Sequence, residues 1–386
     1  MELIFGIILG LVILVLLVVV HELGHGIVAR RNGVVVEEFG IGFPPKAWGK
    51  KIKRSILGKN VLFTLNWLPL GGFVKLQGEH DSASKKGDYG AATYWQKTKI
   101  LLAGVLMNWV VAIILLSCMA LVGLPKILPD QYYVSQDATI TTLPLQLTYV
   151  GEGTPAEASG LKPGDELLRF NGMGVSSPDD LTKLTQVHKG EAAEIIYKRG
   201  GVEYTTKTTL RADNIDKKGF LGVSSRTREE IKSTWSAPIV GTVTTAQFTW
   251  ATLKGTSEVA FNAAKGFFQS LSFDKATRES GNKELEVVSG SVAGPVGILG
   301  VIFPQAQSAG PKQLLFLTAI ISLSLAVMNT LPIPALDGGR WFLMTVYKLR
   351  KKELTKEREE KVQTIGFLVL IGLVILVTFA DVGKFF

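Results

Sequence analysis

Four stretches of this chain are uncharged and long enough to cross a lipid bilayer, which takes about 20 helical residues. They run from Leu3 to Val20, Ile100 to Leu124, Leu314 to Leu336 and Val362 to Ala380. Only 19% of the residues are charged, against about a quarter in soluble domains. The first stretch has no preceding basic segment and no small-residue cleavage site, so we expect a retained helix rather than a signal peptide. The sequence therefore predicts a polytopic α-helical membrane protein with four transmembrane helices.

The distribution of Lys and Arg predicts the orientation of these helices, because basic loops stay on the cytoplasmic side. Residues 30–99 hold 13 basic and 5 acidic side chains, and residues 340–361 hold 8 and 4. The long segment 124–311 holds 19 and 20. We expect the two basic loops inside, with the middle segment and both termini outside. The net charge of +9 then reflects the cytoplasmic position of the basic loops. A nucleic-acid partner is not expected, because the outer domain has no basic stripe interleaved with aromatic residues.

These spans and loops divide the chain into four regions. Two contain the membrane helices, one is a folded outer domain, and one is an outer region around an amphipathic helix. The helix is expected over residues 236–271, either on the membrane surface or packed on the outer domain. The regions are 1–123 (helices one and two), 124–225 (outer domain), 226–311 (amphipathic region) and 312–386 (helices three and four).

The first cytoplasmic loop contains a predicted β-hairpin, within residues 52–79. Val61 to Asn66 and Phe73 to Leu76 have strand composition and flank the turn-forming Pro69, Gly71 and Gly72. Such a hairpin either dips into the membrane or lies on the cytoplasmic surface. Its exposed edge would be able to pair with an unwound peptide by strand addition.

The inner end of the first apolar stretch carries a metal-ligand pattern, His21-Glu22-Leu23-Gly24-His25. Residues four apart lie on one helix face, so His21 and His25 can reach one zinc ion while Glu22 reaches a water molecule there. Ionisable side chains at the edge of a membrane helix are costly and usually functional. The alternative is a polar cluster at a helix end.

Catalytic zinc sites usually take three protein ligands, so a third is needed. The best candidate is Asp337, in Asn329-Thr-Leu-Pro-Ile-Pro-Ala-Leu-Asp337-Gly-Gly at the inner end of the third stretch, at a depth similar to that of His21 and His25. Pro332 and Pro334 break the helix, which is tolerated in a membrane only where the chain lines a cavity or is buried. Asn329 is placed to contact a substrate backbone. The alternative for Asp337 is an ordinary loop aspartate.

Together these motifs resemble the site-2 protease family (M50-type intramembrane zinc metalloproteases), and most closely its bacterial RseP-type regulator proteases. The likeness extends to Leu70-Gly-Gly-Phe-Val-Lys75 and Ala293-Gly-Pro-Val-Gly-Ile298. It implies that His21, His25 and Asp337 bind one zinc ion per chain and that Glu22 is the catalytic base. The residues expected to contact substrate are Asn329, Pro332, Pro334, Gly71, Gly72, Phe73 and Val74.

The outer domain contains one segment, residues 154–172, that resembles the core of bacterial PDZ domains. A PDZ domain is an α+β fold that adds an extended peptide to a sheet edge, so we expect a peptide segment or a C-terminus as its partner. Gly219-Phe-Leu-Gly222 is either its ligand loop or a strand-flanking turn, and we favour the turn.

The resemblance implies regulated intramembrane proteolysis of single-span membrane proteins, such as anti-sigma factors or remnant signal peptides, in the bacterial inner membrane. The active site is expected near the cytoplasmic side. Two other classes stay open: a catalytically inactive, membrane-anchored PDZ scaffold and a membrane metal transporter. Transport usually needs repeats and a polar path across several helices, and neither is apparent.

Overall fold

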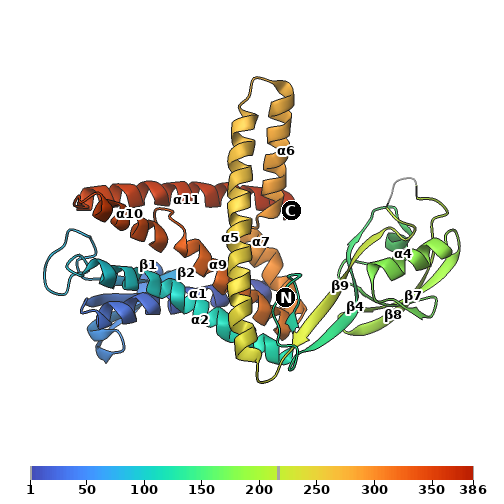
Figure 1. Cartoon of the computed structure of the whole chain (residues 1–386), viewed down its shortest axis with the longest axis horizontal. Helices are drawn as coiled ribbons and strands as arrows, with labels where there is room; N and C mark the ends of the chain where they lie inside the picture. Colours follow the sequence, from blue (N-terminus) through green and yellow to red (C-terminus); the bar gives the residue numbers. More distant parts are fainter. Residues whose placement is uncertain (1, 215–217, 386) are drawn as a thin grey trace. The chain divides into compact units, whose positions relative to one another are not determined.

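The computed structural model describes residues 2–214 and 218–385. It divides into two compact units, one formed by Met1–Leu116 with Gly241–Phe386 and the other by Ser117–Val240. Figure 1 shows the chain coloured along the sequence. We describe each unit by itself.

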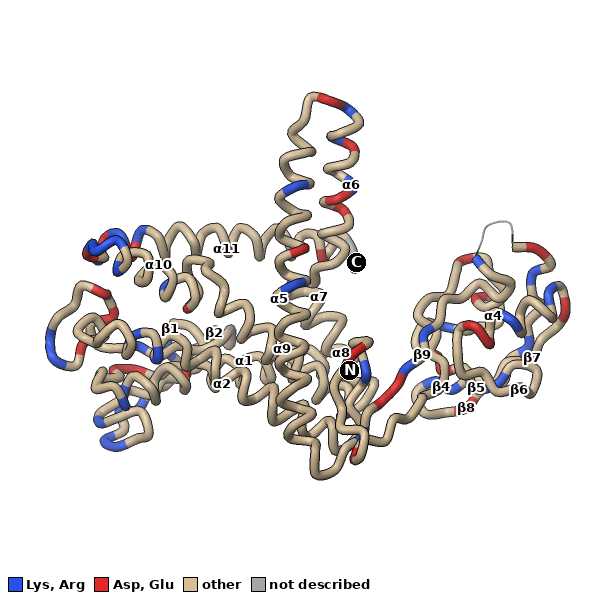
Figure 2. Tube along the Cα trace, viewed as in Figure 1, with Lys and Arg blue, Asp and Glu red and all other residues tan. Residues whose placement is uncertain are grey.

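Five described helical stretches are long and apolar enough to span a membrane. Four of them correspond to the expected spans, and these are helices α1 (Glu2–Arg31), α2 (Tyr94–Val122), α9 (Pro311–Thr330) and α11 (Lys356–Phe385). The fifth, Lys275–Ser308, begins in the charged helix α6 (Lys275–Ser291) and is interrupted at 292–294. Figure 2 shows few charges along α1, α2 and α9, whereas the charges of α11 gather toward its N-terminal end.

The third span ends earlier than the apolar stretch that predicted it. Helix α9 stops at Thr330, and residues 331–336 are not helical. Pro332 and Pro334 explain this, since proline removes a backbone donor and clashes with the preceding turn. Asp337 then opens a separate helix, α10 (Asp337–Leu349). The expected span to Leu336 is therefore wrong at its inner end, although the predicted helix break is confirmed.

The predicted hairpin around Pro69 is also wrong. The sheet of this unit has two long antiparallel strands, β1 (Val36–Ser55) and β2 (Gly58–Leu76), joined at residues 56 and 57. Ile41 of β1 pairs with both Leu65 and Gly72 of β2. The two β2 segments that were expected to pair with each other therefore lie on opposite sides of β1. Gly71, with φ +113°, bends β2 instead of closing a hairpin.

A helix is confirmed at the position of the amphipathic helix expected over 236–271, and it is α5 (Ala237–Ser270). Its C-terminal half runs beside α6, as Figure 1 shows, and Lys265 forms a 2.5 Å ion pair with Glu284. Short helical turns then lead to α9. They are α7 (Pro295–Gly297), the π-helical turn η1 (Ile298–Ile302) and α8 (Phe303–Ser308).

The second unit is a seven-stranded α+β domain. Its strand order is β3-β9-β4-β5-β7-β8, with β6 paired to β5. Leu145, Leu147, Leu167, Phe170 and Ile195 are fully buried in its core. The elements are β3 (Leu124–Pro125), β4 (Thr139–Val150), α3 (Pro155–Ala158), β5 (Glu166–Phe170), β6 (Met173–Gly174), α4 (Pro178–Val187), β7 (Ala192–Arg199), β8 (Val202–Thr209) and β9 (Val223–Lys232).

Candidate metal centre

Helix α1 and the start of α10 bring three metal-binding side chains together. His21 and His25 are each 6% exposed, and their Nε2 atoms are 3.1 Å apart. Oδ2 of Asp337 lies 2.9 Å from Nε2 of His21 and 3.2 Å from Nε2 of His25. Residues more than 300 positions apart in the sequence thus form one triangle of ligand atoms.

The triangle fits a zinc ion. Tetrahedral zinc holds its nitrogen and oxygen ligands at about 2.0–2.2 Å, which places them about 3.3 Å from one another. Nδ1 of His25 is 2.7 Å from the carbonyl oxygen of Ile100, so this nitrogen carries the proton of the neutral ring and Nε2 is a bare acceptor. Nε2 of His25 therefore faces the carboxylate oxygen of Asp337, and the two acceptors repel each other. A cation bound between the two atoms would remove this repulsion.

Asn108 of α2 orients the other imidazole. Its side-chain nitrogen is 3.3 Å from Nδ1 of His21, and its side-chain oxygen is buried without a hydrogen-bond partner among the described residues. If His21 binds metal through Nε2, its Nδ1 carries a proton and needs an acceptor. The opposite amide orientation of Asn108 supplies that acceptor and satisfies both groups.

Gly104 of α2 leaves the space in which the ligand atoms meet. A methyl group added at Gly104 would lie 2.4 Å from Nε2 of His25 and 2.6 Å from Nε2 of His21. Any larger residue would therefore push into the centre. The backbone of α2 forms one wall of the site, and glycine is the residue that permits this close approach.

Glu22 lies beside the triangle and is held by the sheet. The ligand atoms of His21, Glu22 and His25 all lie within 4.8 Å of one another. Oε2 of Glu22 accepts a 3.0 Å hydrogen bond from the backbone N–H of Val74 in β2. The carboxylate is thus close to the ligand atoms without being part of the triangle.

The other residues predicted to contact substrate lie either on β2 or at the end of α9 and in the turn after it. Gly72 adjoins Glu22, since a methyl group there would lie 3.9 Å from Cγ of Glu22, whereas the ring of Phe73 covers Gly40 of β1. Asn329 is half-buried in the last turn of α9. Pro334 packs against Gly366 of α11.

Two cavities lie along α11 and β2 in this unit. One has a volume of about 460 Å³ and an apolar lining that includes Leu11 and Val18 of α1 and Gly71 of β2. The other has a volume of about 810 Å³ and includes Asp337, with charged side chains in its wall. Val18 is one helical turn before Glu22, so the apolar cavity leads toward the carboxylate.

The sequence motifs did not reveal Asn108, Gly104, Gln363 or Gly366. Each acts across a contact with a segment that is far away in the sequence, and Gln363 of α11 does so by accepting a hydrogen bond from the backbone N–H of Ala335. An amide in the middle of an apolar helix was a usable signal for Asn108, because polar groups in membrane helices are costly. A glycine in a membrane helix is common, so Gly104 and Gly366 gave no specific signal.

The model of peptidase family M50 matches residues 9–373 of this chain. The chain belongs to peptidase family M50. This family membership, the zinc-fitting centre and the names of the relatives identify it as a zinc metalloprotease of the site-2 protease group, hence a hydrolase.

Relatives that match over nearly the whole of both chains support this assignment for the M50 protease. A Clostridium perfringens protein, provisionally named a zinc metalloprotease, is 32% identical over 95% of both chains. Zinc metalloprotease RasP of Shouchella clausii is 26% identical over 96% of this chain and 97% of its own. The Bacillus subtilis regulator of sigma-W protease RasP is 25% identical over 96% of each.

One solved structure resembles part of the M50 protease. The PDZ domain of an SdrC-like protein from Listeria monocytogenes is 26% identical and covers 24% of this chain and 93% of that domain. The TM-score is 0.19, which is too low to assign the fold of the second unit.

Proposed function

We propose that this M50 protease is an intramembrane endopeptidase that cleaves single-span membrane proteins. His21, His25 and Asp337 would hold one zinc ion, and Glu22 would be the catalytic base. The observation that carries the proposal is the triangle of ligand atoms at the inner end of an apolar helix, with a separate carboxylate beside it. A peptide bond at this depth belongs to a membrane-embedded substrate.

Different residues of the chain would carry out different parts of peptide-bond hydrolysis. A bound zinc ion supplies Lewis acidity, which activates water and polarises a carbonyl group. Glu22 takes a proton from the attacking water and passes it to the leaving amine. The N–H of Val74 keeps the Glu22 carboxylate oriented. Asn108 and the carbonyl of Ile100 hold the two imidazoles in the tautomer that leaves Nε2 free.

The substrate would bind as an extended strand along β2. A hydrogen-bonded helix shields its carbonyl groups, so the segment to be cut must unwind. Among the described residues, 72–76 pair with β1 on one side and with no strand on the other, and Val74 turns its N–H toward Glu22. Strand addition at Gly71, Gly72, Phe73 and Val74 would bring an unwound segment to the centre. The apolar cavity would hold the part of the substrate that remains in the membrane, and Asn329, Pro332 and Pro334 would contact the substrate as well.

The substrate class follows from the relatives as well as from the site. The Bacillus subtilis relative is named as a regulator of sigma-W, so anti-sigma factors are the first candidates, with remnant signal peptides as the second. We place the protein in the bacterial inner membrane, with four spans and with both termini and the second unit outside.

We also propose that the second unit is a PDZ-like peptide-binding domain. Strand β3 pairs with only Glu230 and Ile231 of β9, so residues 223–228 have no strand partner on that side among the described residues. Gly219 and Gly222, both with positive φ, precede this edge. The edge would bind a peptide or a C-terminus, while the bulk of the domain would reject substrates whose outer domain has not yet been removed.

Cleavage of a model single-span substrate by matched variants tests the protease proposal. Glu22→Gln should retain zinc and lose activity, whereas His21→Ala and Asp337→Ala should lose zinc. An inactive PDZ scaffold would lack cleavage in the parent protein as well, and a metal transporter would move zinc across vesicles. If Glu22→Gln cuts at the parent rate, Glu22 is not the base.

Cysteine labelling tests the orientation. In a Cys118→Ala background, Ser84→Cys and Lys183→Cys are both at exposed positions. An impermeant thiol reagent applied to intact cells should label only the second. Labelling of Ser84→Cys alone would reverse the topology.

A further inference from the structure

Three residues on one face of α11 contact residues 334–340, the segment that contains Asp337. They are Glu359, Gln363 and Gly366, spaced four and three residues apart, and so they form one stripe on the helix. We call them the α11 stripe.

Gln363 and Gly366 hold the part of the turn before Asp337. Oε1 of Gln363 accepts a 2.5 Å hydrogen bond from the backbone N–H of Ala335. A methyl group added at Gly366 would lie 2.3 Å from Cβ of Pro334 and 2.7 Å from its carbonyl oxygen. The helix therefore touches the turn directly at Gly366, and only glycine allows it.

Glu359 holds the part of the chain after Asp337. Its Oε1 accepts a 3.0 Å charge-assisted hydrogen bond from Nε of Arg340, one turn into α10. Arg340 also contacts Glu79 and lies 4.6 Å above the ring of Tyr89. The other carboxylate oxygen of Glu359 accepts from the backbone N–H of Asp81. Removing one partner would leave the others unpaired in a largely buried cluster, which is costly.

The turn needs such support because its own hydrogen bonds hold its backbone only in part; they run from the N–H of Ile333 to the carbonyl of Leu331 and from the N–H of Leu336 to the carbonyl of Ile333. Residues 331–336 lie between two helices, and Pro332 and Pro334 donate no backbone hydrogen bonds. Ala335 has φ +75°, a left-handed conformation that is unfavourable for a residue with a side chain. Neighbouring contacts must therefore hold Ala335 in place.

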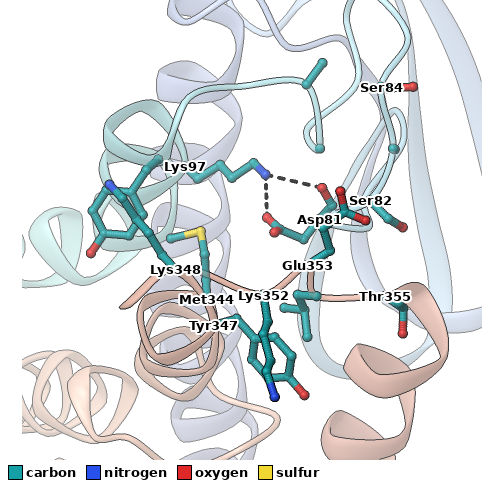
Figure 3. A pocket seen from close by; sticks show the side chains of 15 residues that line it. Asp81, Ser82, Ser84, Lys97, Met344, Tyr347, Lys348, Lys352, Glu353 and Thr355 are labelled. Atoms are coloured by element: carbon teal, nitrogen blue, oxygen red, sulfur yellow. Dashed lines mark hydrogen bonds and ion pairs between the residues drawn. The ribbon is translucent and has the colours of Figure 1, made fainter. Parts of the chain in front are cut away.

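Helix α10 is also held by α2, from its second turn onward. Nε1 of Trp341 is 3.2 Å from the hydroxyl of Thr98, and Nζ of Lys348 lies 3.5 Å from the centre of the Tyr94 ring. Figure 3 shows this region, where Lys97 reaches across a cavity of about 690 Å³ to Asp81. Helix α2 thus holds α10 from Trp341 onward, and the α11 stripe contacts the chain on both sides of the first residue of α10, Asp337.

We propose that the α11 stripe positions Asp337 against His21 and His25 and thereby sets the zinc affinity of the centre. This inference rests on the proposed role of Asp337 as a metal ligand. Residues that orient metal ligands typically contribute 10- to 100-fold in affinity when intact. Among the described residues, the stripe makes no hydrogen bond or ion pair with His21, His25 or the Asp337 carboxylate, so it acts through the chain on either side of Asp337.

The experiment compares zinc affinity by chelator competition in the full chain, with two matched pairs on α11. Gly366→Ala should weaken zinc binding by about 10- to 100-fold, whereas Gly372→Ala should not, because a methyl group at Gly372 meets no described atom within 4 Å. Gln363→Met should weaken binding similarly. Gln363→Glu keeps an acceptor for the N–H of Ala335 and should stay close to the parent.

The outcomes separate this inference from the proposed function. Parent-like zinc affinity in both Gly366→Ala and Gln363→Met would overturn the inference, even if Asp337→Ala loses zinc as expected. Retention of zinc by Asp337→Ala would instead remove Asp337 from the ligand set. Should Gly366→Ala fail to fold, the Gln363 pair decides, because Gln363→Met removes the hydrogen bond to Ala335 without adding an atom at the close contact between Gly366 and Pro334. Equal weakening in Gln363→Met and Gln363→Glu would also contradict the proposed hydrogen bond.

Discussion

The backbone N–H of Val74 donates a 3.0 Å hydrogen bond to the carboxylate of Glu22, which links the edge of a β-sheet to a membrane helix. The side chain of Val74 takes no part in this bond. The strand edge that we propose for substrate binding and the carboxylate that we propose as the base are therefore adjacent.

Replacing Val74 by proline should remove this hydrogen bond while leaving the strand in place. Proline lacks the N–H and is tolerated where a strand edge carries no ladder bond at that position. We expect Val74→Pro to reduce kcat by about 100-fold, the lower range for general base catalysis, with zinc content unchanged. Steady-state cleavage of a model substrate measures this. Val74→Ala keeps the N–H and is the control; a matching loss in that variant would assign the effect to the side chain.

Asn108 should control zinc affinity through the ring of His21. We expect Asn108→Leu to weaken zinc binding by about 10- to 100-fold, because it leaves Nδ1 of His21 without an acceptor. Asn108→Asp retains an acceptor and should bind zinc more tightly than Asn108→Leu. Chelator competition in detergent measures both. Equal affinities in the two variants would show that Asn108 does not act on the imidazole.

A methyl group added at Gly104 should weaken zinc binding without changing any of the three proposed ligand side chains. It would come within 2.6 Å of both Nε2 atoms, so Gly104→Ala should bind zinc at least about 10-fold more weakly. Metal analysis after gel filtration measures the loss. Gly255→Ala on α5 is a suitable control, since a methyl group there meets no described atom within 4 Å. Full zinc occupancy in Gly104→Ala would mean that α2 does not form a wall of the site.

Asp137 should make the stability of the second unit depend on pH. Burial opposes its ionisation, but hydrogen bonds from Ser236 and Thr234 outweigh burial and hold the pKa of the carboxyl below its usual value. Because the folded-state pKa is lowered, the stabilisation is complete above the unfolded value of about 3.9 and is lost as pH falls further.

Asp137→Asn should therefore lower the Tm at pH 7, and the difference from the parent should shrink below about pH 4. Thermal unfolding followed by circular dichroism at both pH values checks this. A difference that grows in acid would contradict the role of the ionised carboxylate.

The parts of the fold that depend on local periodicity could be predicted from the sequence. The apolar stretches predicted α1, α2, α9 and α11, and the spacing of His21 and His25 placed both on one helix face. Pro332 and Pro334 correctly predicted the break before Asp337. These features depend on neighbouring residues, and so the sequence contains the information.

The parts that failed depend on distant pairing. The segments around Pro69 had strand composition, but strand composition does not specify a partner. Ile41 pairs with both Leu65 and Gly72, and no local pattern indicates that β1 lies between them. Asn108 and Gly366 likewise acquire their roles through packing against His21 and Pro334, which only the tertiary structure brings close.

The position of Gly104 has a consequence for which ions the protein accepts. Calcium takes six to eight oxygen ligands, and magnesium usually retains several waters. With the α2 backbone against both imidazoles, the centre has too little space on that side for a crowded hydration shell. Calcium and magnesium would therefore lack room for the number of ligands that they require, whereas a four-coordinate ion would fit.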